Sequence, residues 1–367
     1  MPKRFTVPGP DEIAARVPLD RLPVLGQLVP HLPDLTGGRP GKIPVKIPVK
    51  IPVKVPVRLP PWLFRDIAYF SYAAPDLLSV DGETTTQEDI FRVSAWSGVV
   101  RRVTDDRTSP VFRSDRDPAW SPSRDRLAIH SASDGDADSH LVVVDAASGA
   151  VVATLGAGRS PEWLDASALL YLGSVDAGTD AVRTDVFCVD IGSGTVTRIT
   201  DVGVGGDIGT LSWHPTAGLA MGIVQTTPTE RSSVAVVPAA AVGAVRAGGP
   251  PVPRTAFTFV TGPSTRASTP GWSPSGDRLA VSTWSDGAPP RVGVLTLATG
   301  ALALVPGPTP PTLSDFGAVF SRDGRVIAFT RGDEDQWSEI WLYTLASGHL
   351  RQLTDDGRTR FKGSLDW

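Results

Sequence analysis

The chain has 367 residues, with 35 Lys and Arg, 39 Asp and Glu, and a single cysteine, Cys188. One cysteine excludes an internal disulfide framework and a zinc site made of paired cysteines. With 41% hydrophobic and 20% charged residues, the chain has the composition of a protein that buries a core. No stretch reaches the roughly 18 apolar residues of a membrane-spanning helix, and residues 1–17 lack the apolar segment of a signal peptide, so we expect a cytoplasmic protein.

The N-terminal segment, residues 1–61, is predicted to be a basic, proline-rich arm. Residues 41–60 repeat Ile-Pro-Val-Lys, with proline at every fourth position, which excludes a helix and favours an extended chain. In an extended chain the Ile and Val side chains share one face, and Lys and Pro share the other. Only one backbone edge keeps all its N–H groups, so the arm can pair with another strand on one side only.

Two interpretations of the arm remain open. It is either a strap that lies on its own chain, or a docking segment that binds a partner by strand addition or in a groove. Four spaced lysines without interleaved aromatic residues do not indicate a nucleic-acid partner. The arm residues predicted to contact a partner protein are Ile43, Val45, Lys46, Ile47, Val49, Lys50, Ile51, Val53 and Lys54.

Residues 62–367 contain a repeat. The segment 119–129, which begins Ala-Trp-Ser-Pro, recurs at 271–281, and weaker copies lie at 319–329, 212–215 and 162–165. A further copy opens at residue 365. The repeat is marked by aromatic residues that we expect to pack between structural units and not to bind a ligand. These residues are Trp120, Trp163, Trp213, Trp272, Phe320 and Trp367.

A second mark alternates with the aromatic one. Short turns that end in glycine, such as Ala147-Ser148-Gly149, separate two alternating apolar runs in each period, which is the pattern of a β-hairpin. Each period therefore holds four short strands, as in a blade of a β-propeller. The first blade, with strands near 67–72, 89–93 and 99–106, has no aromatic strand of its own. Residues 361–367 supply it, and this predicts an all-β, six-bladed propeller of four-stranded antiparallel blades, closed by the C-terminal strand.

The repeated Trp-Ser-Pro-x-x-x-x-Leu-Ala segment and the run from Arg351 to Asp356, with Leu353, Thr354 and Asp355, resemble the TolB-type propeller repeat. The resemblance extends over about residues 67–367 and implies the six-bladed fold. Propellers of this kind serve as periplasmic protein-binding proteins, as gating domains of prolyl peptidases and as sugar-acting enzymes. The proline-rich arm stands in place of the α/β N-terminal domain of TolB, so we expect a relative of this repeat and not TolB itself.

Catalytic motifs are not found. The sequence contains no complete Gly-x-Ser-x-Gly, no His-Glu-x-x-His, no phosphate loop and no dinucleotide fingerprint. The acidic run 134–139, with Asp145 after it, imitates a calcium loop, but we expect a solvated hairpin loop with Asp145 at the end of a strand. The sequence therefore predicts no catalytic residue, no cofactor and no metal site.

The leading hypothesis is a non-enzymatic interaction or scaffold protein that binds partner proteins through the arm and one face of the propeller. The alternative is a lyase or hydrolase that acts on a carbohydrate or small metabolite at the central channel. The sequence does not specify an oligomeric state. By their register, the charged residues expected on loops around the channel are Arg113, Asp115, Arg116, Asp117, Arg159, Asp207, Arg266, Asp315, Arg358 and Arg360. The predicted partner contacts among them are Arg113, Arg116, Asp117, Arg159, Arg358 and Arg360.

Overall fold

In a computed structural model, all described residues belong to one compact unit, Arg58–Trp367. The arm predicted over residues 1–61, including its nine candidate contact residues, lies outside the described residues. The described residues are 66–73, 77–80, 83–86, 88–105, 113–133, 138–179, 182–203, 206–225, 232–262, 265–285, 287–308, 310–333 and 337–367.

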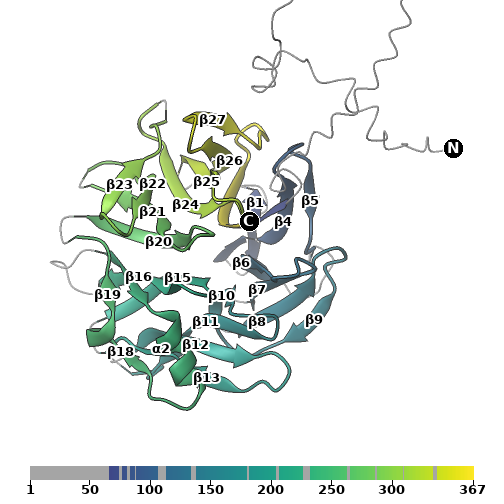
Figure 1. The fold of residues 1–367 in the computed structure, drawn as a ribbon. Coiled ribbons are helices and arrows are strands. Elements are labelled where there is room, and N and C mark those ends of the chain that lie inside the picture. The colour runs from purple at the N-terminus through teal and green to yellow at the C-terminus, as the bar shows by residue number, and fades with distance from the viewer. Residues whose placement is uncertain are drawn as a thin grey trace, which may run out of the picture. The chain divides into compact units, whose positions relative to one another are not determined.

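The described residues form a propeller of six four-stranded antiparallel sheets, or blades, as the sequence predicts (Figure 1). The inner strand of each blade lines the central channel, and the fourth strand lies at the periphery. From the innermost to the outermost strand, blade 1 consists of β28 (Arg360–Asp366), β1 (Asp66–Ala73), β4 (Asp89–Ser94) and β5 (Val100–Arg102), and blade 2 of β6 (Ser114–Trp120), β7 (Arg126–Ser133), β8 (Asp138–Asp145) and β9 (Val151–Thr154). In the same order, blade 3 consists of β10 (Arg159–Trp163), β11 (Ala168–Val175), β12 (Arg183–Asp190) and β13 (Val196–Arg198), and blade 4 of β15 (Gly206–His214), β16 (Gly218–Gln225), β17 (Ser233–Val237) and β19 (Thr258–Phe259). Blade 5 consists of β20 (Arg266–Trp272), β21 (Arg278–Trp284), β22 (Arg291–Thr296) and β23 (Ala301–Leu304), and blade 6 of β24 (Ser314–Phe320), β25 (Val326–Asp333), β26 (Trp337–Thr344) and β27 (His349–Gln352).

Blade 1 is closed by strands from opposite ends of the described chain. Strand β28 pairs antiparallel with β1, so that Lys362 lies opposite Ser71. The Ser71 hydroxyl donates to the carbonyl of Phe361 (2.8 Å), and Arg360 Nε donates to the Ser71 hydroxyl (3.0 Å). The predicted closure by the C-terminal strand is thus confirmed, and it leaves β1 without an open edge.

The aromatic marks of the repeat pack between blades, as expected. Trp120 of blade 2 packs in one buried cluster with Ala68 and Ile90 of blade 1. Trp272 of blade 5 packs in the same way with Ala220 of blade 4. A large ring at the end of each inner strand fills the wedge between neighbouring sheets, which explains why the period carries an aromatic residue.

The Leu-Thr-Asp part of the repeat is also structural. In blade 3, the Thr200 hydroxyl accepts the Val186 N–H (2.9 Å) and donates to the buried carboxylate of Asp185 (2.8 Å). In blade 6, Thr354 donates in the same way to Glu339 (2.5 Å). The threonine therefore joins the exit of the fourth strand to the third strand, which makes this motif a signature of the fold and not of an activity.

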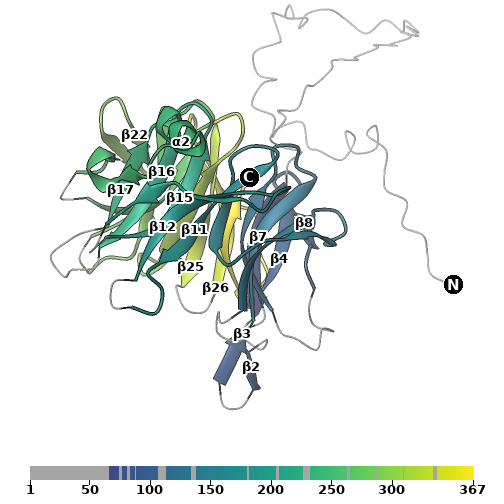
Figure 2. The ribbon, with the colours of Figure 1, turned by 90° about the horizontal axis from the view of Figure 1, so that it is seen from below.

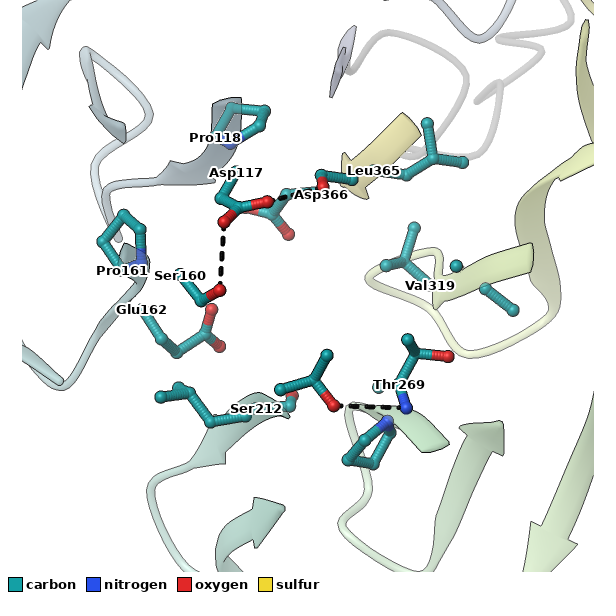
Figure 3. A pocket seen from close by; sticks show the side chains of 17 residues that line it. Asp117, Pro118, Ser160, Pro161, Glu162, Ser212, Thr269, Val319, Leu365 and Asp366 are labelled. Carbon is teal, nitrogen blue, oxygen red and sulfur yellow. Dashed lines mark hydrogen bonds between the residues drawn. The ribbon is translucent and has the colours of Figure 1, made fainter. Parts of the chain in front are cut away.

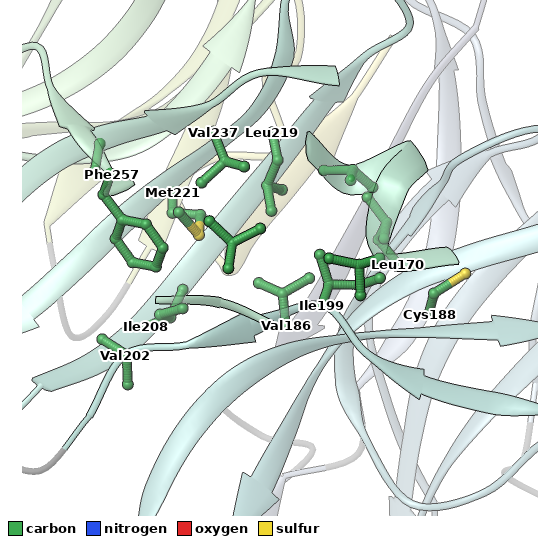
Figure 4. Close-up of a cluster of buried hydrophobic side chains, with 14 of the residues drawn as sticks. Leu170, Val186, Cys188, Ile199, Val202, Ile208, Leu219, Met221, Val237 and Phe257 are labelled. Carbon is green, nitrogen blue, oxygen red and sulfur yellow. The ribbon is translucent and has the colours of Figure 1, made fainter. Parts of the chain in front are cut away.

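Two insertions depart from the repeat and were not predicted. Blade 4 contains a helix, α2 (Ala239–Arg246), followed by the short strand β18 (Val252–Pro253), which pairs in parallel with β14 (Thr200–Asp201), and by the 3-10 turn Arg254–Ala256. Residues Val242 and Val245 of α2 pack on a hydrophobic cluster formed mainly by blades 3 and 4 (Figure 4). Among the described residues, no helix is long and apolar enough to cross a membrane.

Blade 1 carries the second insertion between β1 and β4. It is a hairpin of β2 (Leu77–Val80) and β3 (Glu83–Thr86), which form a two-stranded sheet of their own. The hairpin projects away from the body of the propeller (Figure 2). Among the described residues, neither insertion has a counterpart in the other blades, so a search for repeats does not reveal them.

Candidate functional site in the central channel

The six inner strands contribute equivalent residues to the wall of a central channel. In all six, the register of pairing with the second strand shifts at a bulge or irregularity. In five of them, the first residue of this interruption has a left-handed φ, between 47° and 59°. These residues are Asp117, Ser160, Thr269, Gly317 and Ser364. The repeated bulge turns the following residues toward the channel axis at the same depth in each blade.

Asp117 links three inner strands at this depth. Its carboxylate accepts hydrogen bonds from the Ser160 hydroxyl of β10 (3.0 Å) and from the Ser364 hydroxyl of β28 (2.6 Å). Figure 3 shows Asp117 and Ser160 beside a cavity of about 170 Å³, which Ser364 also lines. Across the channel, the N–H of Thr269 donates to the Thr210 hydroxyl (3.2 Å). Aspartate suits this position because its carboxylate accepts both hydrogen bonds and because it tolerates a left-handed backbone conformation better than most residues do.

Two further carboxyl groups line the channel, each two residues beyond the left-handed residue of its strand. The residue just before the aromatic mark is Glu162 in β10 and Asp366 in β28, whereas the other four blades have Ala, Ser, Gly or Val there. Glu162 Oε1 accepts the backbone N–H of Trp213 (3.2 Å), and Asp366 Oδ2 accepts that of Trp120 (2.6 Å). Each carboxylate thus holds the aromatic residue of the next blade in the ring while it faces the channel.

The environment favours the protonated form of both acids. Burial raises the pKa of the Glu162 carboxyl to about 8, and the charge of Asp366 adds to this increase. Burial also raises the pKa of Asp366, although the N–H of Trp120 and the positive charge of Arg124 oppose that effect. Within the described part of the chain, neither acid forms an ion pair. At neutral pH the pair therefore retains a proton.

Beyond these acids the channel widens into a chamber of about 490 Å³. Glu162 and Asp366 line both this chamber and the narrower cavity, so they stand at the junction of the two. Arg124 and Arg322, on the turns that follow β6 and β24, line the chamber as well. Its walls carry the six aromatic marks of the repeat: Trp120, Trp163, Trp213, Trp272, Phe320 and Trp367.

Several groups of the chamber wall are already engaged. The indole N–H of Trp163 donates to the Ala119 carbonyl (2.9 Å). The Arg124 guanidinium lies 4.3 Å from the centre of the Trp120 ring. By contrast, Trp120 and Trp272 are each only 8% exposed, and their indole N–H groups have no acceptor among the described residues. Unsatisfied buried donors of this kind are uncommon in folded proteins.

The charged residues predicted on loops lie at the opposite end of the inner strands. The loop assignment is wrong for most of them, because the inner strands begin up to seven residues before their aromatic mark. Only Arg113, just before β6, and Arg358, between β27 and β28, lie outside strands. The others belong to inner strands; they are Asp115, Arg116, Asp117, Arg159, Asp207, Arg266, Asp315 and Arg360.

Most of these side chains have partners inside the propeller. Arg113 Nε donates to the Ser131 hydroxyl (2.9 Å), Arg159 donates to Thr184 (3.3 Å), and the Arg358 guanidinium lies 4.6 Å from the centre of the Trp337 ring. Arg116 forms an ion pair with Glu88. The fully buried Asp315 binds Arg331 (2.6 Å) and Arg291 (3.1 Å). Of the predicted contact residues that the structure describes, only Asp117 lines the cavity of Figure 3.

Sequence reasoning missed the acids at the junction. The signal was available, because aligning the repeats on the aromatic residue shows two acids at a position that is otherwise small or apolar.

Asp145 does end its strand, as predicted, and its carboxylate accepts the N–H of Ser148 (2.8 Å) in the following turn. Residues 134–137 of the calcium-like run lie outside the described residues. In the described part of the chain, no group of three or more His, Cys, Asp or Glu is arranged to hold a metal ion.

The comparisons with known proteins support the fold. No family model and no curated protein matches the sequence. Among solved structures, TolB from Acinetobacter baumannii superposes with a TM-score of 0.60 at 14% identity, over 82% of this chain and 65% of that one. The fold is that of a TolB-type propeller. A putative TolB from Agrobacterium tumefaciens superposes with a TM-score of 0.50 at 14% identity, over 81% of this chain and 96% of that one.

The TolB-type fold alone does not indicate an activity. Hydrazine synthase from Kuenenia stuttgartiensis also superposes, with a TM-score of 0.58 at 9% identity, over 82% of this chain but 46% of that one. This chain likewise spans only 65% of the length of the Acinetobacter TolB. An enzyme and TolB proteins thus share the architecture, and function must be argued from the channel.

Proposed function

We propose that this TolB-type propeller is a non-enzymatic interaction protein that binds a segment of a partner protein in the chamber at the aromatic end of its channel. The observation that carries the proposal is the chamber itself. Its volume of about 490 Å³ is in the range of pockets that enclose a ligand, about 300–1,000 Å³. Its walls are rich in Trp, with Arg beside them, and these two residue types dominate the binding energy of protein interfaces.

The N-terminal arm remains part of this proposal as a second contact surface. An extended chain with aligned Ile and Val side chains, from Ile43 to Val53, suits strand addition to a partner sheet. Protein is the proposed partner rather than nucleic acid, because the acids at the base of the chamber repel phosphate. A cytoplasmic location is also proposed, and cell fractionation tests it.

Site-specific photo-crosslinking tests the chamber as a contact surface. A photoreactive amino acid is placed at Pro122 or at Pro215, two exposed chamber residues on different blades, and at Val152 as a control. Val152 is 49% exposed on the outermost strand of blade 2. We expect a light-dependent adduct with the same protein from both chamber positions and none from Val152. Adducts from the control position only would refute the proposal.

A second candidate function rests on the acids at the junction. Two carboxyl groups with raised pKa values in one cavity are the arrangement of a general acid and base, as in hydrolysis of a glycosidic bond. Even with one proton retained by the pair of Glu162 and Asp366, the three acids including Asp117 carry net negative charge, so a neutral carbohydrate is a better substrate than a uronate. This candidate predicts hydrolysis of a neutral oligosaccharide that is abolished by Glu162→Gln, measured as new reducing ends. An unchanged rate in that variant would eliminate it.

A further inference from the structure

We propose that the partner segment places a basic side chain, the ammonium of Lys or the guanidinium of Arg, into the chamber between Glu162 and Asp366. This inference rests on the proposed function and specifies the chemistry of the occupant. It is carried by the position of the two acids, by the lack of an ion pair to either acid among the described residues and by the aromatic walls.

The first step concerns the hydrogen bonds that the acids still lack. Glu162 Oε1 accepts the N–H of Trp213, whereas no donor among the described residues reaches Oε2. Asp366 Oδ2 accepts the N–H of Trp120, and Asp366 Oδ1 accepts the N–H of the adjacent residue, Trp367 (2.7 Å). Each carboxylate oxygen has two lone pairs, so both groups can accept further hydrogen bonds from a cation.

The second step is that neither acid forms an ion pair among the described residues. The positive charges of Arg124 and Arg322, which line the chamber, act on Asp366 from beyond ion-pair distance, because both guanidinium groups donate to backbone carbonyls. Arg124 Nη2 donates to the carbonyl of Asp66 (2.5 Å), and Arg322 Nη2 donates to the carbonyl of Pro122 (3.2 Å). Two carboxylates without a paired cation are costly to ionise in a partly desolvated site. A basic side chain from outside supplies the missing ion pair.

The third step is the wall through which such a side chain must pass. Indole rings surround the approach, and they attract cations more strongly than other aromatic rings do. The methylene stem of Lys or Arg is apolar and can pack on these rings while the charged end reaches the acids.

Other occupants fit less well. An anion would meet Asp117, Glu162 and Asp366, which all line the narrower cavity beneath the chamber. A bare metal ion would need more protein ligands than the described residues gather at one point. The chamber therefore has the charge and the walls for a long basic side chain.

A pair of blocked peptides tests this directly with the full-length protein. The probes are acetyl-Gly-Lys-Gly-amide and acetyl-Gly-norleucine-Gly-amide, and binding is followed by the fluorescence of the chamber tryptophans. We expect the Lys peptide to bind at least about tenfold more tightly than the norleucine peptide, whose side chain is apolar and of similar length. Equal affinity of the two peptides, or no saturable binding of the Lys peptide, would overturn the inference.

The acids are then neutralised without loss of their structural hydrogen bonds. In the double variant Glu162→Gln and Asp366→Asn, amide oxygens still accept the N–H groups of Trp213 and Trp120, so the propeller remains folded. We expect the Lys peptide to bind this variant at least about tenfold more weakly, with the norleucine peptide within about twofold of its wild-type affinity. If the double variant is unstable, Glu162→Gln alone serves. The matched control is Asp165→Asn, an acid two residues beyond β10 and outside the chamber lining, which keeps the full preference.

The crosslinking experiment separates failure of this inference from failure of the proposed function. Mass spectrometry of the adduct from Pro122 or Pro215 identifies the bound segment, which we expect to contain Lys or Arg. A segment without a basic residue would refute the inference and leave partner binding in the chamber intact. Absence of adducts from both chamber positions would refute both.

Discussion

Removal of the Asp117 carboxylate tests whether the polar ring in the channel holds the inner strands together. Asp117 accepts one hydroxyl from blade 3 and one from blade 1. A hydrogen bond to a charged acceptor contributes about 1.5–3 kcal/mol, and both bonds are partly exposed, so the lower limit applies to each. Asp117→Ala loses both, and it also places alanine at φ 50°, which costs about 1 kcal/mol more. We expect a total loss of about 4 kcal/mol.

The variant Asp117→Asn tolerates the backbone conformation and keeps one acceptor oxygen, so we expect a loss of about 1.5 kcal/mol. The free energy of unfolding is measured by urea titration with tryptophan fluorescence. A double-mutant cycle with Ser364→Ala isolates the bond to blade 1, and a coupling energy above about 1 kcal/mol is expected. Asp190→Asn, in a local hairpin turn, serves as a control with a smaller loss. A loss below about 1 kcal/mol for Asp117→Ala, or a coupling energy near zero, would refute the reasoning.

The other predictions concern buried groups of the propeller. Because the pKa of Glu162 is higher in the folded state, about 8 against an ordinary value of 4.5, the folded state binds more protons between these pH values and stability falls as pH rises. Glu162→Gln should therefore raise the Tm at pH 8 relative to wild type and change it little at pH 4; the opposite pattern would contradict this. Thr354→Val should destabilise by about 1–3 kcal/mol in urea titration, because buried Glu339 loses a donor. Lys362→Met should cost about 3–5 kcal/mol, since it leaves Glu339, 3.1 Å from Lys362 Nζ, without its cation; addition of Glu339→Gln should recover much of that loss. Cys188 is buried and its pKa is raised, so a thiol reagent should modify it only on unfolding; rapid reaction in native protein would contradict its placement.

The fold could be predicted from the sequence because each blade repeats the same physical solution. An aromatic wedge, a glycine turn and a threonine that joins two strands recur in register, so even weak copies such as Glu162-Trp163 indicated a blade. The closure followed from counting strands, since the first blade lacked the aromatic strand that residues 361–367 supply.

The site could not be predicted in the same way, because it consists of departures from the repeat. Glu162 and Asp366 replace small or apolar residues at one position, and only the circular arrangement brings blades 1 and 3 to the same point of the channel. The charges expected to surround the channel entrance, such as Arg116 and Asp315, are instead bound within and between blades. Helix α2 was missed because no other blade has a copy of it.

The closure of blade 1 has a consequence for synthesis of the protein on the ribosome. Strand β1 is made first among the described strands, yet its inner neighbour β28 is made last. Blades 2 to 6 can each pair their four strands as they emerge, because these strands are consecutive apart from short insertions. Blade 1 must wait, with one edge of β1 unpaired, until residue 366 has left the ribosome. The first blade to be translated is thus the last to be completed, and during that interval the nascent chain exposes the edge at which another nascent chain could pair.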